Sequence, residues 1–206
     1  LRVIVAQKNV RLYKTNFQAI CDSLVYDAAD SLFQFFYDPV LWSDTSQFTA
    51  EVISVFLKDE KIDRVELNQK AFLINSSDEV YFNQIKGRTI AAFFENDTLK
   101  TMDVNGNGET LYYVQDDDKA YVTANKTECS NMKIYFKENQ VQDIMFYGKP
   151  LGKAHPMKGI NTQALEIAGF QWRMKERPLG KADLQVIPVK IFEKPAIDIT
   201  EDDEGE

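Results

Sequence analysis

The feature that most constrains the fold of this chain is a pattern that occurs four times between residues 24 and 147. Each copy reads as a strand, a polar turn and a second strand. The copies start at residues 24, 55, 92 and 134, so they lie 31, 37 and 42 residues apart, a spacing typical of stacked repeat proteins. The copies cover residues 24–38, 55–68, 92–105 and 134–147.

The apolar positions differ on the two sides of each turn. Before the turn they alternate with a period of two, as Val55 and Leu57 do, so they share one face of a strand. After the turn a step of three precedes a step of two, as in Ile62, Val65 and Leu67. This irregular step predicts a bulge or bend shortly after the turn. In the first copy, which has one added residue, the corresponding positions are Leu32, Phe35 and Tyr37.

Superposing the copies predicts an inward row of apolar side chains. For each residue alone, core packing is the plain interpretation, because each repeat must bury its apolar face on its neighbours. The row as a whole is our candidate lipid-binding set. It comprises Leu24, Tyr26, Phe35, Val55, Leu57, Val65, Leu67, Phe94, Met102, Val104, Ile134, Phe136, Ile144 and Phe146. Its bulky rings are large enough to close the interior.

The 206 residues, 44% of them hydrophobic, suffice for a sizeable core, and the first 150 show no sustained helical spacing. We therefore expect an all-β fold, a solenoid-like stack of antiparallel strand pairs over residues 1–150. A C-terminal extension, 151–200, is expected to hold a short helix at 161–169, an apolar anchor at 169–172 and an edge strand near 184–192, where Pro188 restricts the strand to an edge. The acidic tail, 201–206, is expected to be disordered.

Charge and composition limit the classes of partner that the protein can bind. The net charge is −8, and no run of Lys or Arg offers a phosphate-binding patch, which argues against a nucleic-acid partner. No apolar stretch reaches the length of a membrane-spanning helix. The sequence opens inside a strand pattern at Arg2, and we expect residues before Leu1, a removed signal included. Cys21 and Cys129 form no framework, and a single disulfide between them stays open.

Candidate chemistry is sparse. Asp103, Asn105, Asn107 and Gly108 match the first half of a calcium loop, but the closing acidic position is Val114, so we expect an Asn- and Gly-rich turn between repeats. Residues 116–118, three aspartates, read as a solvated turn. His155 has no second ligand or nucleophile at motif spacing. We therefore expect no enzymatic activity, no cofactor and no metal.

Several segments are similar to a known family. They are Asn9–Tyr13, Ala19–Tyr26, Asp38–Trp42 followed by Gln47–Ala50, and Phe82–Gly87 with Asp103–Gly108. In these segments, over residues 9 to about 150, the chain resembles the OstA-like proteins, the family of LptA and of the N-terminal domain of LptD. Residues 169–172 with Arg177 and Pro178 look like the OstA-like group of Bacteroidetes.

The resemblance implies a twisted β-jellyroll whose apolar groove shields the acyl chains of lipopolysaccharide in the periplasm. It also implies association with transport proteins, or with further copies, through exposed edge strands, and a place near the outer membrane. The expected function is therefore a non-catalytic lipid carrier or bridge. Two alternatives stay open: a carbohydrate-active or cell-surface β-solenoid with an exposed functional face, and a scaffold that joins partners through its edges.

Overall fold

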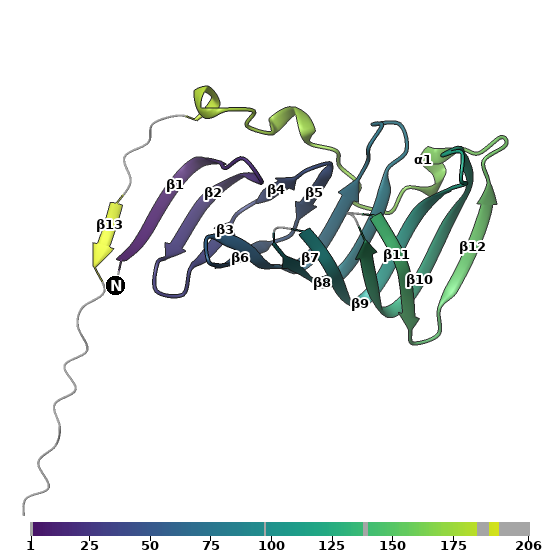
Figure 1. Ribbon diagram of the computed structural model, residues 1–206, viewed down its shortest axis with the longest axis horizontal. Coiled ribbons are helices and arrows are strands. Elements are labelled where there is room, and N and C mark those ends of the chain that lie inside the picture. The colour runs from purple at the N-terminus through teal and green to yellow at the C-terminus, as the bar shows by residue number, and fades with distance from the viewer. Residues whose placement is uncertain (1, 97, 138–139, 185–189, 194–206) are drawn as a thin grey trace, which may run out of the picture.

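A computed structural model describes the chain except for residues 1, 97, 138–139, 185–189 and 194–206. The described part is almost entirely antiparallel β-structure, which confirms the all-β prediction. Figure 1 shows the strands following one another along the long axis of the molecule. The strands are β1 (Arg2–Tyr13), β2 (Gln18–Asp27), β3 (Leu32–Phe36), β4 (Val40–Ser43), β5 (Ser46–Thr49), β6 (Val52–Lys58), β7 (Lys61–Asn75), β8 (Asn83–Glu95), β9 (Thr98–Gln115), β10 (Tyr121–Lys137), β11 (Gln140–Tyr147), β12 (Leu151–Pro156) and β13 (Lys190–Glu193).

The sheet is folded lengthwise into two arms, because each long strand pairs with different short strands in its two halves. The first half of β7 pairs with β6 and its second half with β5. β2 pairs with β4 in its first half and with β3 in its second, and β10 pairs with β12 in its first half and with β11 in its second. We call the side that holds β3, β6 and β11 the repeat arm, and the side that holds β4, β5 and β12 the strap arm. The predicted turns between β2 and β3 and between β6 and β7 lie at the free end of the repeat arm, whereas the other two include residues 97 and 138–139, outside the described residues.

A row of left-handed residues marks the fold line between the arms. Each strand that runs from the repeat arm to the strap arm crosses this line at two consecutive residues with positive φ. Two such residues in succession turn the chain sharply, and L side chains rarely adopt that backbone. The pairs are Lys8–Asn9, Tyr37–Asp38, Gln69–Lys70, Gly106–Asn107 and Gly148–Lys149.

This line corrects two predictions. The Asn- and Gly-rich stretch at 103–108 is not a turn between repeats. It lies within β9, where Gly106 and Asn107 bend the strand across the fold line. Tyr37, which the repeat placed with Leu32 and Phe35, also lies on the line and is 73% exposed, because the backbone changes direction there.

The irregular step, which all four copies share, predicts a bulge in each, and the bulge occurs in three of them. In the β6–β7 ladder Phe56 pairs with Arg64 and Leu57 pairs with Ile62, so Asp63 is the extra residue. The β8–β9 and β10–β11 ladders repeat this shift, with Lys100 and Gln142 as the extra residues. The first copy pairs β2 with β3 without a shift.

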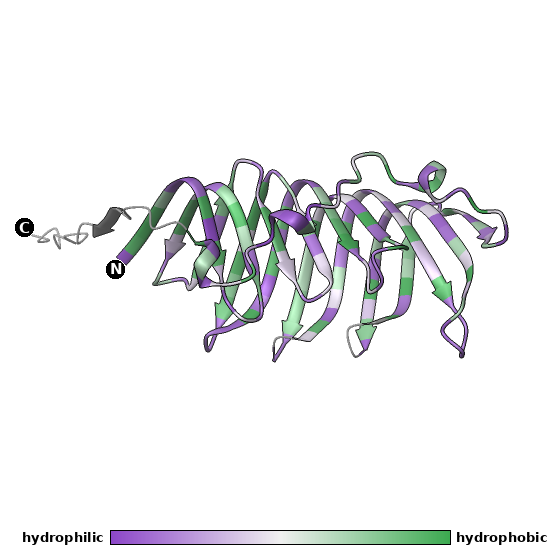
Figure 2. Ribbon diagram, turned by 90° about the horizontal axis from the view of Figure 1, so that it is seen from above, coloured by the Kyte–Doolittle hydropathy of each residue, from purple (hydrophilic) through white to green (hydrophobic). Residues whose placement is uncertain are grey.

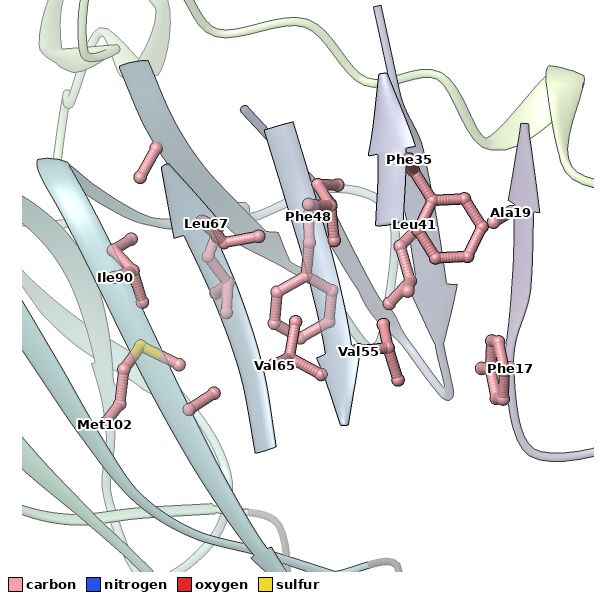
Figure 3. Close-up of a cluster of buried hydrophobic side chains, with 14 of the residues drawn as sticks. Phe17, Ala19, Phe35, Leu41, Phe48, Val55, Val65, Leu67, Ile90 and Met102 are labelled. Carbon is pink, nitrogen blue, oxygen red and sulfur yellow. The ribbon is translucent and has the colours of Figure 1, made fainter. Parts of the chain in front are cut away.

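The main core lies between the two arms. In the repeat arm, cross-strand register aligns Val55, Val65, Ala92, Met102 and Ile134 in one row across five strands. These side chains are almost completely buried, and the rings and aliphatic groups of the strap arm meet them from the other side (Figure 3). Apolar and polar positions alternate along the strands (Figure 2), as burial of one face requires.

The segment after β12 returns along the outer face of the strap arm toward β1 (Figure 1). It contains α1 (Thr162–Leu165) and two short 3₁₀ helices, Met174–Glu176 and Lys181–Asp183. Asn161 caps α1, as expected, because its side chain accepts a hydrogen bond from Ala164 N. The helix ends four residues before Gly169, earlier than the sequence indicated. We call residues 157–184 the strap.

A second, smaller core holds the strap in place. Ile167 is buried against Phe72, Ile74 and Leu111, and the expected apolar anchor is confirmed by Phe170 and Trp172, which both pack on Phe82. Figure 1 shows this segment spanning several strands of the same arm.

Three buried glutamines on that face bind the strap. Gln47 donates from Nε2 to the Gln171 carbonyl at 2.7 Å, and its Oε1 accepts from Arg173 N at 2.6 Å. Gln84 Oε1 accepts from Ile167 N at 2.8 Å, and Gln18 Oε1 accepts from Arg177 Nε at 2.7 Å. A polar row is tolerated on a buried face because its amides are satisfied by the strap.

The expected extension is described in part. The division at residue 150 stays a prediction, and β12, which begins just after it, pairs with β10. The described part of the predicted edge strand is β13, which pairs antiparallel with β1. Residues 185–189 of that prediction, and the predicted disordered tail at 201–206, lie outside the described residues.

Candidate binding groove

The space between the arms opens into a cavity of about 1240 Å³. Its repeat-arm wall is apolar, with Phe94 and Leu99 from the β8–β9 pair and Phe136, Val141 and Ile144 from the β10–β11 pair. These side chains belong to the main core, yet they are only partly buried. The cavity therefore exposes an apolar wall that the neighbouring strands do not cover.

The facing wall of the strap arm changes character with depth. Near the fold line it is apolar, with Phe48, Leu73 and Ile85 aligned across β5, β7 and β8. Two residues further along each strand the same face becomes polar. Register places Ser46 opposite Asn75, and Asn75 opposite Asn83, on this wall.

Hydrogen bonds organise this polar row. Asn75 Nδ2 donates to Thr45 Oγ1 at 2.9 Å and to Ser46 Oγ at 3.0 Å. Asn83 Oδ1 accepts from Tyr113 N at 2.9 Å. The wall thus presents fixed, uncharged groups toward the cavity.

The interior is filled at the end nearest β1. The turn after β1 places Phe17, 1% exposed, between the arms, where Phe35 and Leu41 are equally buried (Figure 3). Lys14 Nζ donates to the Glu60 carbonyl at 2.7 Å, which joins the strap-arm turn after β1 to the repeat-arm turn before β7. Bulky rings fill the interior at this end; of the predicted rings Phe35 takes part, whereas Phe94 and Phe136 line the cavity.

The fourteen predicted side chains occupy different parts of the interior. Eight lie in the fully packed core: Leu24, Phe35, Val55, Val65, Leu67, Met102, Val104 and Ile134. Phe94, Phe136 and Ile144 line the large cavity, and Ile144 and Phe146 line a smaller one of about 350 Å³. Leu57 is partly buried against the core. Tyr26 lies near the β1 end and stacks on Phe33 with ring centroids 4.3 Å apart. A lipid-binding role for this set stays a prediction.

Sequence reasoning missed the entire strap-arm wall. Phe48, Leu73, Ile85 and Tyr112 all line the cavity, but the four aligned copies stop near the fold line. The spacing of two between Leu73 and Asn75, together with the apolar Phe48 on the neighbouring strand, was a signal that could have revealed this wall. It was obscured because apolar residues occupy both faces of this arm, one toward the cavity and one toward the strap.

Charged groups stand at the rim of the cavity rather than on its walls. Asp44, Asp116, Asp117, Lys119 and Arg177 all lie among its lining residues. Burial lowers the pKa of Arg177, whose guanidinium is already engaged with Gln18 and the Asp44 carbonyl. On the wall itself, burial raises the pKa of the Tyr112 phenol, which therefore stays neutral.

The loop between β7 and β8 forms part of the same rim. Asp78 accepts hydrogen bonds from Val80 N, Tyr81 N, Ser76 Oγ and the Tyr121 hydroxyl. Burial, the largest single influence, opposes ionisation of Asp78, but these four hydrogen bonds together hold its pKa below the ordinary value. Burial, and then the bond to Asp78, raise the pKa of Tyr121 to about 12.

Within the described residues, no group of three or more His, Cys, Asp or Glu side chains is arranged to hold a metal ion. Cys21 and Cys129 are both free thiols. No helix in the described part of the chain is long and apolar enough to cross a membrane. The arrangement offers an apolar wall, a neutral polar wall and a wide space between them.

Comparison with solved structures gives a likeness in fold. The structure is similar to the crystal structure of LptH from Pseudomonas aeruginosa, described as the LptA-homologous periplasmic component of the lipopolysaccharide transport device, with a TM-score of 0.48 and 13% identity over 61% of this chain and 80% of LptH. No family model and no curated protein matches the sequence.

Proposed function

We propose that this protein is a non-catalytic lipid carrier that holds the acyl chains of lipopolysaccharide between its two arms. The observation that carries the proposal is the large cavity with an uncovered apolar wall, built from Phe94, Leu99, Phe136, Val141 and Ile144. Pockets for small molecules usually measure about 300–1,000 Å³, so this space suits a guest with long chains.

The energetics favour an aliphatic guest. Each methylene group that leaves water for this wall contributes about 0.8 kcal/mol, so a chain of ordinary length gains enough to offset the cost of ordering it. A protein that only joins partners through its edges has no need for an open interior, and a surface-binding solenoid would place its aromatic residues outside. The cavity supports the carrier over both alternatives.

The resemblance to OstA-like proteins supports the remaining parts of the proposal. It supports a carrier that acts in the periplasm, on the route of lipopolysaccharide to the outer membrane. Partners would add strands at the end of the sheet formed by β11 and β12, where no strand of the described chain pairs with their outer edges. The opposite edge, on β1, is paired with β13 over Arg2–Val5.

A photo-crosslinking experiment tests the proposal. A benzophenone amino acid at Phe94 or Phe136 should capture lipopolysaccharide, because both side chains line the cavity. The matched control is Phe56, the same residue type on the opposite face of the sheet, where the Arg64 guanidinium lies 4.1 Å from its ring centroid. Capture at Phe56 alone would refute an internal site and favour a surface-binding function.

A further inference from the structure

The smaller cavity, at the β12 end of the groove, has an uncharged polar patch on its strap-arm wall. Thr110 and Tyr112 on β9 lie directly opposite Thr127 and Asn125 on β10, and all four line this cavity. Thr110 and Tyr112 also line the larger cavity, so the patch lies where the two spaces join.

The patch faces an apolar surface. Ile144 and Phe146 of β11 line the same space from the repeat arm. The only charged lining residue among the described ones is Lys153, which is exposed and lies opposite Lys126 in the β10–β12 ladder. Lys126 donates to the Leu165 carbonyl of the strap, on the outer face, so the inner surface is neutral.

Two members of the patch have unused hydrogen-bonding capacity. Within the described residues, neither the Tyr112 hydroxyl nor the Asn125 amide bonds to another protein group, in contrast to Asn75 and Asn83 further along the wall. Both side chains are partly buried. Polar groups inside an apolar groove favour a guest that supplies partners for them, since leaving them unpaired on burial is costly.

We propose that this patch selects acyl lipids that carry an uncharged hydroxyl or amide group alongside the chain. The inference rests on the proposed function and specifies its guest. The chain lies on Ile144 and Phe146 while its hydroxyl or amide exchanges hydrogen bonds with Tyr112 and Asn125. A phosphate is excluded as the partner of this patch, because no cation faces the inner surface.

The test uses two neutral single-chain probes that differ by one hydroxyl group, glucosamine N-acylated with 3-hydroxytetradecanoate or with tetradecanoate. Displacement of a bound pyrene-labelled fatty acid from the whole protein measures their affinities. We expect the hydroxylated probe to bind about 3- to 10-fold more tightly, the ratio expected from one net hydrogen bond.

Variants of the patch should remove the preference without removing binding. In Tyr112→Phe combined with Asn125→Leu, the two probes should differ by less than about 2-fold, because the acyl chain still has its apolar wall. Circular dichroism shows whether the double variant still folds. If it does not, Tyr112→Phe alone, which deletes only one hydroxyl group, replaces it and should reduce the preference. Tyr135→Phe, on the opposite face of β10, should leave the preference unchanged.

The outcomes separate the two proposals. Equal binding of both probes to the unmodified protein would overturn the selection by this patch and leave lipid carriage intact. An unchanged preference in the double variant would also overturn it. If the pyrene-labelled fatty acid itself does not bind, lipid carriage is refuted, and this inference falls with it; if it binds and neither probe displaces it, only this inference is overturned.

Discussion

Replacing Gln47 by leucine tests how the strap is held. The Gln47 side chain is 1% exposed, and its amide makes two short bonds to strap backbone, to the Gln171 carbonyl and to Arg173 N. Leucine has nearly the same size but takes from both backbone groups the partner that they have under the strap. Each such group costs about 1–3 kcal/mol, and the added apolar surface offsets about 1 kcal/mol of the total.

We therefore expect Gln47→Leu to lower the free energy of unfolding by about 2–4 kcal/mol. The melting temperature should fall by roughly 5–15 °C for a domain of this size. Urea unfolding followed by circular dichroism measures the change, and an unchanged slope would show that the denatured state is unaffected. Trypsin should also cleave faster after Arg173 and Lys175 if the strap loosens.

The control is Gln7→Leu, an identical replacement at an exposed position on β1, with an expected change below about 0.5 kcal/mol. A loss of similar size in both variants would refute the reasoning, because it would reflect replacement of glutamine rather than loss of the strap contacts. A stable Gln47→Leu protein with unchanged cleavage would refute it as well.

Two further predictions concern the rim and the fold line. Asp78→Asn should be less stable than the unmodified protein at pH 7, by up to about 1 kcal/mol. Because the pKa of Asp78 is lowered in the folded state, this difference in stability should persist above the ordinary pKa of about 3.9 and disappear as the pH falls below it. A pH-independent difference between the urea midpoints of the two proteins would contradict the assignment. Gly87→Ala should lower the free energy of unfolding in urea by about 1–3 kcal/mol, because the new Cβ would lie 2.6 Å from Cγ1 of buried Val104. The control Gly180→Ala, whose Cβ meets nothing within 4 Å, should be nearly neutral. Equal effects of the two variants would refute the steric argument.

The repeat arm could be predicted from the sequence because its apolar pattern reports directly on register. Ile62, Val65 and Leu67 all face the core, and the bulge at Asp63 lies between the first two. The extra residue in the ladder is therefore what produces the step of three in the sequence. Each strand of the repeat arm has one buried face, so its apolar residues recur at every second position in the sequence. The four turns and most inward side chains follow from that pattern.

The strap arm could not be predicted in the same way, for two physical reasons. Its strands are buried on both faces, so Phe72 and Ile74 face the strap while Leu73 faces the groove, and the alternation disappears. The fold line also leaves little signal in the sequence, because pairs such as Gln69–Lys70 adopt positive φ without containing glycine. Tertiary pairing on both sides imposes that backbone, against the preference of the residues themselves.

The filled end near Phe17 has a kinetic meaning for any guest. With Phe17 seated between the arms and Lys14 Nζ bonded to the Glu60 carbonyl, the described interior is filled at the β1 end. A lipid carried as proposed would load and unload through the part of the groove that stays open, so the two steps would alternate in time. Residence time, rather than flow from one end to the other, would set how fast a single copy delivers its cargo.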